Sequence, residues 1–197
     1  NVVKQLIKEG NSYFDFQVMA PIYKGPNGID MLNKVLQDVC NPKTAKFELK
    51  YFDRIYRIGD KVIQLTNVFD ESIFNGDIGI IKDVISGNIS DSGKDEIHVE
   101  YDGLLVRYLP SDFNMIKHAY AISIHKSQGS EFKTVVIPIC PSYRRMLYRK
   151  LIYTGITRAK TKLYLIGVKD GLLYSIKNNS ESLRNSGLKT RLIEFDN

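Results

Sequence analysis

The amino-acid sequence predicts an α/β fold in which a parallel-sheet lobe carries an inserted small β subdomain. Strand-like and helical segments alternate in the first fifty residues and again after Asp112, which favours parallel strands joined by right-handed crossovers. Between these blocks several short strand-like runs follow one another, a pattern typical of a small SH3-like barrel. We therefore expect residues 1–50 and 111–197 to form one discontinuous lobe and residues 51–110 to form the insert.

The first block predicts a helix, a strand and a second helix. Apolar residues recur at helical spacing up to Gly10, which is a suitable C-cap. The stretch "FDFQVMAP" follows as a short strand that ends at Pro21. The stretch "NGIDMLNKVLQDVC" then predicts a helix whose apolar stripe should face the core. That stripe comprises Ile29, Leu32, Val35, Leu36 and Val39.

The insert is predicted from short strand-like runs and the turns between them. The runs are "DKVIQLTN", "GDIGIIKDVI", "DEIHVEYD" and "LLVRYLP". Asn75-Gly76 and Asp102-Gly103 are hairpin signals, because the tight turns that match strand twist require residues that tolerate positive φ.

The last block returns to alternating strands and helices. The stretches "AYAISI", "KTVVIPIC" and "KLYLIGV" are predicted strands. Between the second and third of them, "YRRMLYRKLIYTGITRAK" predicts a single helix that ends between Thr154 and Lys160. A short helix and a polar tail are expected to follow.

The composition favours some classes of protein and disfavours others. A formal net charge of +6 and a pI near 9.2 favour polyanionic partners such as nucleic acid, although many basic proteins bind none. The sequence has no apolar run of about 18 residues, so we expect no membrane span. It begins without Met in what resembles the middle of a helix, so we expect a fragment of a longer protein.

The cysteines and histidines do not predict a metal site. Cys40 and Cys140 are far apart and match no metal-ligand spacing, which favours two reduced, buried thiols in a cytoplasmic protein. None of the three histidines pairs with a cysteine, so a zinc site is not expected.

A polar loop directly follows the predicted strand "AYAISI". Its sequence is "HKSQGSEF", and loops at the carboxyl ends of parallel strands are where α/β sheets bind ligands. Backbone amides near Gly129, the ammonium of Lys126 and the hydroxyl of Ser127 could together hold phosphate oxygens. A solvated turn explains the same residues equally well.

Two further stretches combine cations with predicted strand or helix ends. "YTGITRAK" places Arg158 near a helix end, where an arginine can instead be a simple partner of the helix dipole. "APIYKGPNGID" presents Tyr23 and Lys24 between a strand and a helix N-terminus, which attracts anions. A Gly-Pro turn with a solvated lysine is an equally good explanation.

The chain lacks the parts of a complete nucleotide-hydrolysing site. A phosphate-binding loop needs Gly, four residues and then Gly-Lys-Ser/Thr. "GSEFKT" has Phe132 and "TGITRAKT" has Ala159 where the second glycine belongs. The acidic pair in "DEIH" is expected to begin a strand, whereas magnesium-binding acids follow one.

Taken in order, three stretches resemble the second motor lobe of superfamily-one DNA helicases of the RecD/TraA type. They are "QVMAPIYKGPNGIDMLNKVLQ", "AYAISIHKSQGSEFKTVVIPI" and "LIYTGITRAKTKLYLIG". The resemblance covers about residues 16–168. It implies that the lobe is RecA-like and that the insert is the SH3-like subdomain of RecD-type enzymes.

The resemblance also implies roles for individual residues. The "HKSQ" loop resembles motif V, which touches single-stranded DNA and links it to the nucleotide, and Arg158 resembles the motif VI arginine finger, the catalytic cation at the γ-phosphate. Residues implied to contact DNA are Tyr23, His125, Lys126, Ser127 and Thr154. Residues implied to contact ATP are Lys24, Gln128, Gly129, Glu131 and Arg158. Motif IV of related enzymes often has an arginine where this chain has Lys24.

The function implied by the resemblance is that of an ATP-dependent DNA helicase moving 5′ to 3′. Its cofactors would be ATP and Mg²⁺, with the magnesium ligands in a missing upstream lobe. Its partners would be single-stranded DNA, duplex junctions and that N-terminal motor lobe, and the fragment alone should not hydrolyse ATP. The alternatives are a non-enzymatic nucleic-acid-binding module and a docking domain of a recombination or repair complex.

Overall fold

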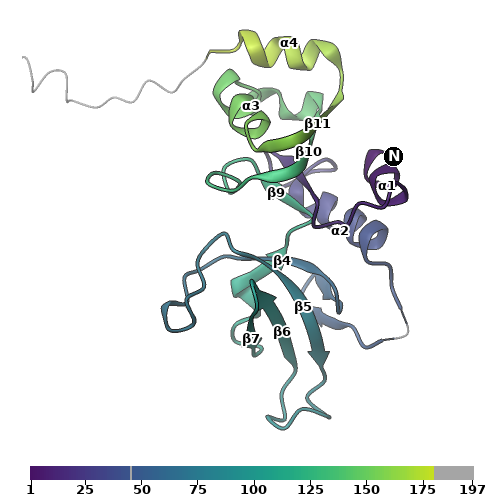
Figure 1. Ribbon diagram of the computed structural model, residues 1–197, viewed down its shortest axis with the longest axis vertical. Helices are drawn as coiled ribbons and strands as arrows, with labels where there is room; N and C mark the ends of the chain where they lie inside the picture. The colour runs from purple at the N-terminus through teal and green to yellow at the C-terminus, as the bar shows by residue number, and fades with distance from the viewer. Residues whose placement is uncertain (45, 180–197) are drawn as a thin grey trace, which may run out of the picture.

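The computed structural model describes residues 1–44 and 46–179, which form an α/β lobe and a β-rich insert (Figure 1). Each part has its own hydrophobic core. The lobe core is built mainly by residues before 40 and after 119, and the insert core by residues between 49 and 116. The α/β fold with an inserted β subdomain is thus confirmed. The predicted polar tail lies outside the described residues.

The lobe is built on a four-stranded parallel sheet with the strand order β11-β10-β1-β9. Every pairing in it is parallel, as the alternation of strands and helices predicted. The strands β1, β9 and β10 are almost entirely buried, which explains their continuous apolar sequences. Their bounds are β1 (Phe16–Ala20), β9 (Ala121–Ser123), β10 (Phe132–Ile139) and β11 (Ala159–Gly167).

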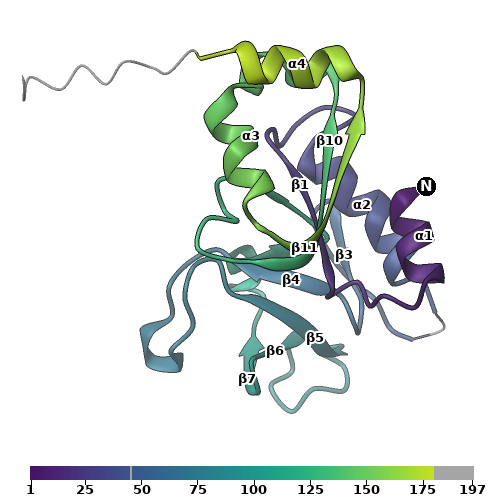
Figure 2. The ribbon, with the colours of Figure 1, turned by 45° about the horizontal axis from the view of Figure 1, so that its top comes forward.

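Helices cover both faces of this sheet. Figure 2 shows α1 and α2 on one side and α3 on the other, with α4 beyond α3. Opposite faces follow from right-handed crossovers, because the chain moves from β1 toward β9 through α2 but from β10 toward β11 through α3. Their bounds are α1 (Val2–Lys8), α2 (Ile29–Cys40), α3 (Arg149–Ile156) and α4 (Lys169–Lys177).

The helix predicted for residues 143–160 is only partly confirmed, because α3 ends at Ile156, within the predicted range, but the stretch does not form one continuous helix. The chain forms a 3₁₀ helix, η3 (Pro141–Met146), then leaves helical geometry at Tyr148, whose φ and ψ are −121° and 153°, before α3 begins. Tyr143 and Leu147 are both buried in the lobe core, so their packing sets the first turn separately from α3. The last residues of the predicted helix already belong to β11, because sheet pairing overrides helical propensity there.

The buried face of α2 differs from the predicted stripe. Val35 is 54% exposed, whereas Asn33 and Gln37 are buried beside Ile29 and Leu36. Asn33 can be buried because its side-chain amide is fully paired with Ala121 in β9. It donates to the Ala121 carbonyl at 2.8 Å and accepts the Ala121 N–H at 2.9 Å. The two cysteines are free but only half-buried, not buried as expected.

The insert is a five-stranded antiparallel sheet with the order β7-β6-β5-β4-β8, accompanied by the β2–β3 hairpin. Asp102 and Gly103 both have positive φ and form the two-residue turn predicted between β6 and β7. Asn75-Gly76 instead ends a longer β4–β5 connection. The elements are β2 (Leu49–Tyr51), β3 (Arg54–Tyr56), β4 (Lys61–Gln64), η1 (Phe69–Glu71), β5 (Ile78–Ile85), β6 (Glu96–Tyr101), β7 (Leu104–Tyr108), η2 (Phe113–Met115) and β8 (Ile116–His118).

The domain limits of 51–110 for the insert stay a prediction. The sheet and core of the insert involve residues from Leu49 to His118, a slightly wider span. Among the residues that the structure describes, no helix is both long enough and apolar enough to cross a membrane.

Candidate nucleic-acid and nucleotide interface

The polar loop after β9 crosses from the carboxyl ends of the sheet strands to their amino ends. It leaves the carboxyl end of β9 and enters the amino end of β10, and β1 lies between these two strands. The parallel register places Ser123 beside Ala20 at the end of β1, and Thr134 beside Phe16 at its beginning. One end of the loop therefore lies near Tyr23 and the other near the start of β11.

Two serines hold the first half of this loop in a compact turn. The hydroxyl of Ser123 accepts the backbone N–H of Lys126 at 3.1 Å, and Ser127 donates its hydroxyl to the carbonyl of Ile124 at 2.7 Å. Ser127 is fully buried, whereas His125 and Gln128 are exposed. In this structure the hydroxyl of Ser127 supports the turn, and the exposed side chains beside it are left to meet a ligand.

Gly129 provides the tight bend in the second half of the loop. Its φ of +89° is a conformation that side-chain-bearing residues rarely adopt, and no atom lies within 4 Å of where a Cβ would stand. Backbone strain, and not crowding, therefore requires a glycine here.

Arg158 lies against the far end of the same loop. Its Nη1 donates to the carbonyl of Ser130 at 3.3 Å, and its own carbonyl accepts the N–H of Phe132 at 2.9 Å. Its Nη2 donates to the Thr157 hydroxyl at 3.2 Å, while its buried Nε has no partner. Among residues 1–44 and 46–179, no carboxylate lies within ion-pair distance of this guanidinium.

The remaining candidates near Arg158 have partners within the lobe. Glu131 is exposed and pairs with Lys160 at 3.2 Å. Thr154 donates its hydroxyl to the Lys150 carbonyl one turn earlier in α3, at 2.9 Å. The structure thus brings Gln128, Gly129, Glu131, Thr154 and Arg158 to one region of the lobe.

Three of the other candidates line a cavity of about 510 Å³ between the lobe and the insert. Tyr23, which is 41% exposed, and Lys24 enter it from the β1–α2 connection, and Lys126 enters it from the polar loop. Lys24 therefore lies with the DNA candidates and apart from Arg158, although the resemblance implied an ATP contact. His125 is exposed at the start of the loop and does not line the cavity.

Positive charge is in excess around this cavity. Its lining includes three carboxylates, and each forms an ion pair with one lining cation: Lys24 with Asp30, Lys34 with Asp53 and Arg57 with Asp38. The three other lining cations have no carboxylate within ion-pair distance among the described residues. They are Arg54, Lys117 and Lys126.

Shifts in pKa agree with that imbalance. Partial burial and the nearby Lys117 lower the pKa of Lys126, which means that they disfavour its charged form. A bound anion would stabilise that charged ammonium. By contrast, the hydrogen bond and charge of Asp30 raise the pKa of Lys24, whose charge is already balanced.

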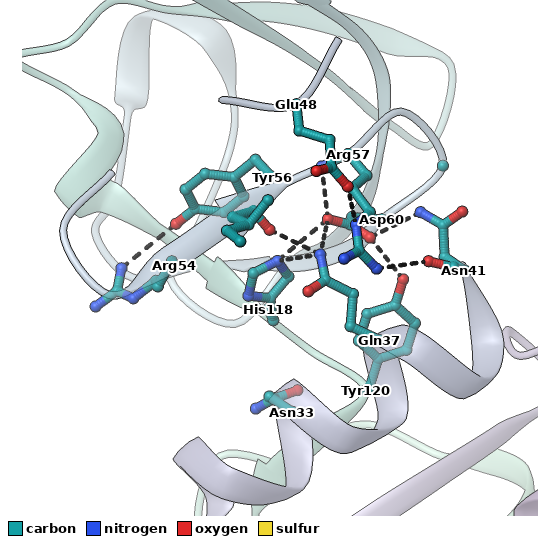
Figure 3. A network of polar contacts seen from close by, with 12 residues as sticks. Asn33, Gln37, Asn41, Glu48, Arg54, Tyr56, Arg57, Asp60, His118 and Tyr120 are labelled. Atoms are coloured by element: carbon teal, nitrogen blue, oxygen red, sulfur yellow. Dashed lines mark hydrogen bonds and ion pairs between the residues drawn. The ribbon is translucent and has the colours of Figure 1, made fainter. Parts of the chain in front are cut away.

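Sequence reasoning missed a buried polar cluster at the junction of lobe and insert. Figure 3 shows it centred on Asp60, which is fully buried. The Asp60 carboxylate accepts hydrogen bonds from Gln37 at 2.7 Å, Asn41 at 2.8 Å and Tyr120 at 2.9 Å, and contacts His118 Nε2 at 3.1 Å. The partners come from α2 and from the β8–β9 segment, so no local pattern signals the cluster.

Lys61, the next residue, is a second buried polar group at this junction. Its Nζ donates to the carbonyls of Tyr13 and Phe16, both at 3.2 Å, and lies 5.5 Å from the ring centroid of Phe14. Burial lowers the pKa of Lys61 to about 8. These contacts tie β4 of the insert to the entrance of β1.

Comparison with known proteins matches the two parts of the chain to two family descriptions. Residues 32–101 match the ATP-dependent RecD-like DNA helicase SH3 domain, and residues 118–166 match the UvrD-like helicase C-terminal domain. The chain is 30% identical over 176 residues to the ATP-dependent RecD2 DNA helicase of Deinococcus radiodurans. It is 28% identical over 186 residues to the RecBCD enzyme subunit RecD of Buchnera aphidicola.

The chain spans only part of these relatives. The alignments cover 89% and 92% of this chain but 23% and 29% of those two proteins. Among solved structures, the Pif1 helicase from Bacteroides in complex with ADP-AlF3 and ssDNA has the same fold, with a TM-score of 0.55. That match has 16% sequence identity and covers 98% of this chain and 48% of the other. The chain therefore corresponds to the C-terminal region of RecD-like superfamily-one helicases, with their SH3 domain and their UvrD-like C-terminal domain.

Proposed function

We propose that this chain is the second motor lobe of an ATP-dependent DNA helicase that couples ATP hydrolysis to translocation on single-stranded DNA and to duplex unwinding. The observation that carries this proposal is the loop between β9 and β10. Its first half lies beside a cavity with excess positive charge, and its second half is bonded to Arg158. One short segment therefore connects the two groups of residues that would bind DNA and the nucleotide.

Arg158 suits the role of a cation that stabilises a phosphoryl group. Its guanidinium has no carboxylate partner among the described residues, and its buried Nε is without a hydrogen bond, so a charge-bearing ligand would complete its interactions. When bound, ATP supplies the phosphoryl group whose transfer to water releases free energy. The bonds to Ser130 and Thr157 hold Arg158 at the edge of the lobe, where it would meet a nucleotide carried by an upstream lobe.

The described residues contain no group of three or more histidine, cysteine or acidic side chains that could hold a metal ion. We assign the magnesium ligands and the phosphate-binding loop to the upstream part of the parent protein, and we expect the chain alone not to hydrolyse ATP.

The cavity between lobe and insert suits a single strand of DNA. Arg54, Lys117 and Lys126 present positive charge that no carboxylate of the described chain balances, and phosphates would supply the missing negative charge. Tyr23 adds an exposed aromatic ring beside them. The structural likeness to a Pif1 helicase in complex with ssDNA supports this assignment.

Coupling would follow from movement of the loop between the two sites. If closure of the lobes shifts Arg158, its bonds to Ser130 and Phe132 pull on the same loop that carries Lys126. The grip on DNA phosphates would then differ between nucleotide states, which is what moves a motor along its track. We assign travel in the 5′ to 3′ direction and a cytoplasmic location as parts of this proposal.

The test is Arg158→Ala in the full-length parent protein. ATP turnover in the presence of single-stranded DNA should fall by about 10³-fold or more, because an arginine finger supplies that much transition-state stabilisation. DNA affinity should stay within about twofold, since Arg158 lies outside the DNA cavity. The matched control is Lys162→Ala, an exposed cation on β11, which should leave both quantities unchanged.

An unchanged turnover in the Arg158→Ala parent would remove the arginine finger from the proposal. A separate outcome concerns the wild-type parent. If it binds DNA but does not hydrolyse ATP, the chain is a nucleic-acid-binding module without motor activity.

A further inference from the structure

The connection between β4 and β5 carries two exposed phenylalanines that neither core uses. Phe69 is 74% exposed and Phe74 is 49% exposed. The connection projects from the insert on the same side of the molecule as the loop after β9 in both views (Figures 1 and 2). Two large aromatic side chains held side by side in solvent suggest an interaction surface.

The connection has a defined structure that presents these rings. Val68 and Ile73 form an isolated antiparallel bridge, and Ile73 is buried in the insert core. The side chain of Asp77 accepts the N–H of Phe74 at 2.7 Å, and that of Asn67 accepts the N–H of Asn75 at 2.8 Å. The turn is therefore fixed by its own polar residues and does not depend on burying either phenylalanine.

The two rings form an edge-to-face pair that stays exposed to solvent. Their centroids are 6.4 Å apart and their planes are inclined at 77°, so the edge of one ring meets a face of the other. Edge-to-face contact of this kind stabilises the pair, and the exposure of both side chains leaves ring faces accessible to a base.

The base of the connection touches the loop that we propose binds DNA. Lys126 Nζ donates to the side-chain oxygen of Asn75 at 3.1 Å, and Asn75 follows Phe74 directly. A strand whose phosphate is held by Lys126 therefore has bases within reach of these rings. At the tip, exposed Asp70 and Glu71 repel phosphates, which leaves uncharged base faces as the part of DNA that fits there.

We propose that Phe69 and Phe74 form a stacking platform for bases of the single-stranded DNA whose backbone is bound at Lys126. This inference rests on the proposed function for the location of the strand. Aromatic side chains bind bases through their faces irrespective of base identity, as single-strand-binding proteins do. The platform adds a base contact to a site that otherwise binds phosphates.

The test compares two oligonucleotides of equal length on the 197-residue chain, by fluorescence anisotropy. One is oligothymidylate and the other is an abasic strand with the same phosphates. The Phe69→Ala, Phe74→Ala double variant should bind oligothymidylate about tenfold more weakly, because stacking is lost. Its affinity for the abasic strand and its salt dependence should not change, because the phosphate contacts remain.

A matched control and a phosphate variant complete the design. Ile89→Ala truncates an 81% exposed apolar side chain in the β5–β6 connection and should bind both strands like wild type. Lys126→Ala should weaken both strands equally. Circular dichroism melting of each variant confirms that it folds.

Three results would overturn the platform. The first is equal affinity of the double variant and wild type for oligothymidylate. If the same substitutions also destabilised the full-length parent, the two phenylalanines would pack against its upstream lobe and not against bases. Equal losses on both strands would show an indirect effect on the phosphate site. Failure of wild type to bind either strand would remove the DNA site itself, and the proposed DNA-binding function with it.

Discussion

The junction around Asp60 and the loop after β9 are both dense in polar side chains, but the two regions use them in opposite ways. At the junction, buried donors and acceptors satisfy one another across lobe and insert. In the loop, Ser127 is the one buried polar side chain, whereas His125 and Gln128 are exposed and the Lys126 ammonium bonds the side chain of Asn75. Polar density therefore does not identify a ligand site. Our proposal rests instead on cations that have no carboxylate partner among the described residues, at Arg158 and around Lys126.

The difference makes the two regions respond differently to substitution. Changes at the junction should alter the stability of the chain, because a buried group that loses its partner carries the full cost of desolvation. Changes in the loop should alter ligand binding and leave stability almost unchanged. Three measurements test this difference between the two regions.

The largest effect is expected from Asp60→Ala. The substitution removes one acceptor from the amides of Gln37 and Asn41, which each keep a backbone carbonyl, and removes the acceptor of the buried Tyr120 hydroxyl. The free energy of unfolding should fall by about 4 kcal/mol, near the upper end for single substitutions. Urea denaturation of the chain followed by circular dichroism measures it.

Two variants control this prediction. Asp53→Ala removes a carboxylate that is 70% exposed and pairs with Lys34 at 3.6 Å, so it should change stability by less than about 0.5 kcal/mol. Tyr120→Phe removes one donor and keeps the carboxylate, so it serves as the test if Asp60→Ala does not fold. It should lower the free energy of unfolding by about 1 kcal/mol. Equal stability of Asp60→Ala and wild type would mean that the junction cluster does not hold lobe and insert together.

A second effect, of about 1 kcal/mol, is expected from pH through Lys61. Burial lowers the pKa of Lys61 from 10.5 to about 8, so between these values the unfolded chain binds more protons than the folded one. Stability therefore rises as pH increases from 7 to 9, by about 1 kcal/mol. Above that range the Cys40 thiol lowers stability as pH rises. Burial raises its pKa to about 12, so at this group the folded chain then binds more protons than the unfolded one.

The Lys61→Met variant isolates this contribution. Methionine keeps the length and apolar contacts of the side chain but does not titrate, so the rise in stability between pH 7 and 9 should disappear. A rise of equal size in the variant would assign the pH dependence to another group.

The contrast between the two regions also explains how much of the molecule could be predicted from its sequence. Parallel strands, the Asp102-Gly103 hairpin and the polar loop after β9 are encoded by contiguous residues, and each was predicted. The Asp60 cluster joins Gln37 of α2 to His118, 81 positions later, and its members have no shared local pattern. The same long-range partners made the α2 stripe partly wrong, because they bury Asn33 and Gln37 while Val35 stays exposed.

The helix predicted for residues 143–160 is only partly confirmed for a related reason. Helical spacing of apolar residues continues through that stretch, but the packing of Tyr143 and the pairing of β11 with β10 are tertiary contacts that divide it. At the candidate site, sequence resemblance supplied the residues, whereas the structure separates Lys24 from Arg158 and assigns the Ser127 hydroxyl to a turn. Which of these residues touch a ligand stays a prediction.

The smallest effect on stability is expected from Lys126→Ala in the loop. The substitution removes one hydrogen bond to Asn75 and also removes repulsion from Lys117, so the free energy of unfolding should change by less than about 0.5 kcal/mol. DNA binding should weaken, and the slope of log affinity against log salt should decrease by about 1, because one phosphate contact is lost. Lys94→Ala, which removes an exposed charge from the β5–β6 connection, should leave that slope unchanged. If Lys126→Ala destabilised the chain as strongly as Asp60→Ala while the salt slope stayed constant, the loop would be a structural cluster like the junction, and the unbalanced cations around the cavity would have to bind something other than DNA.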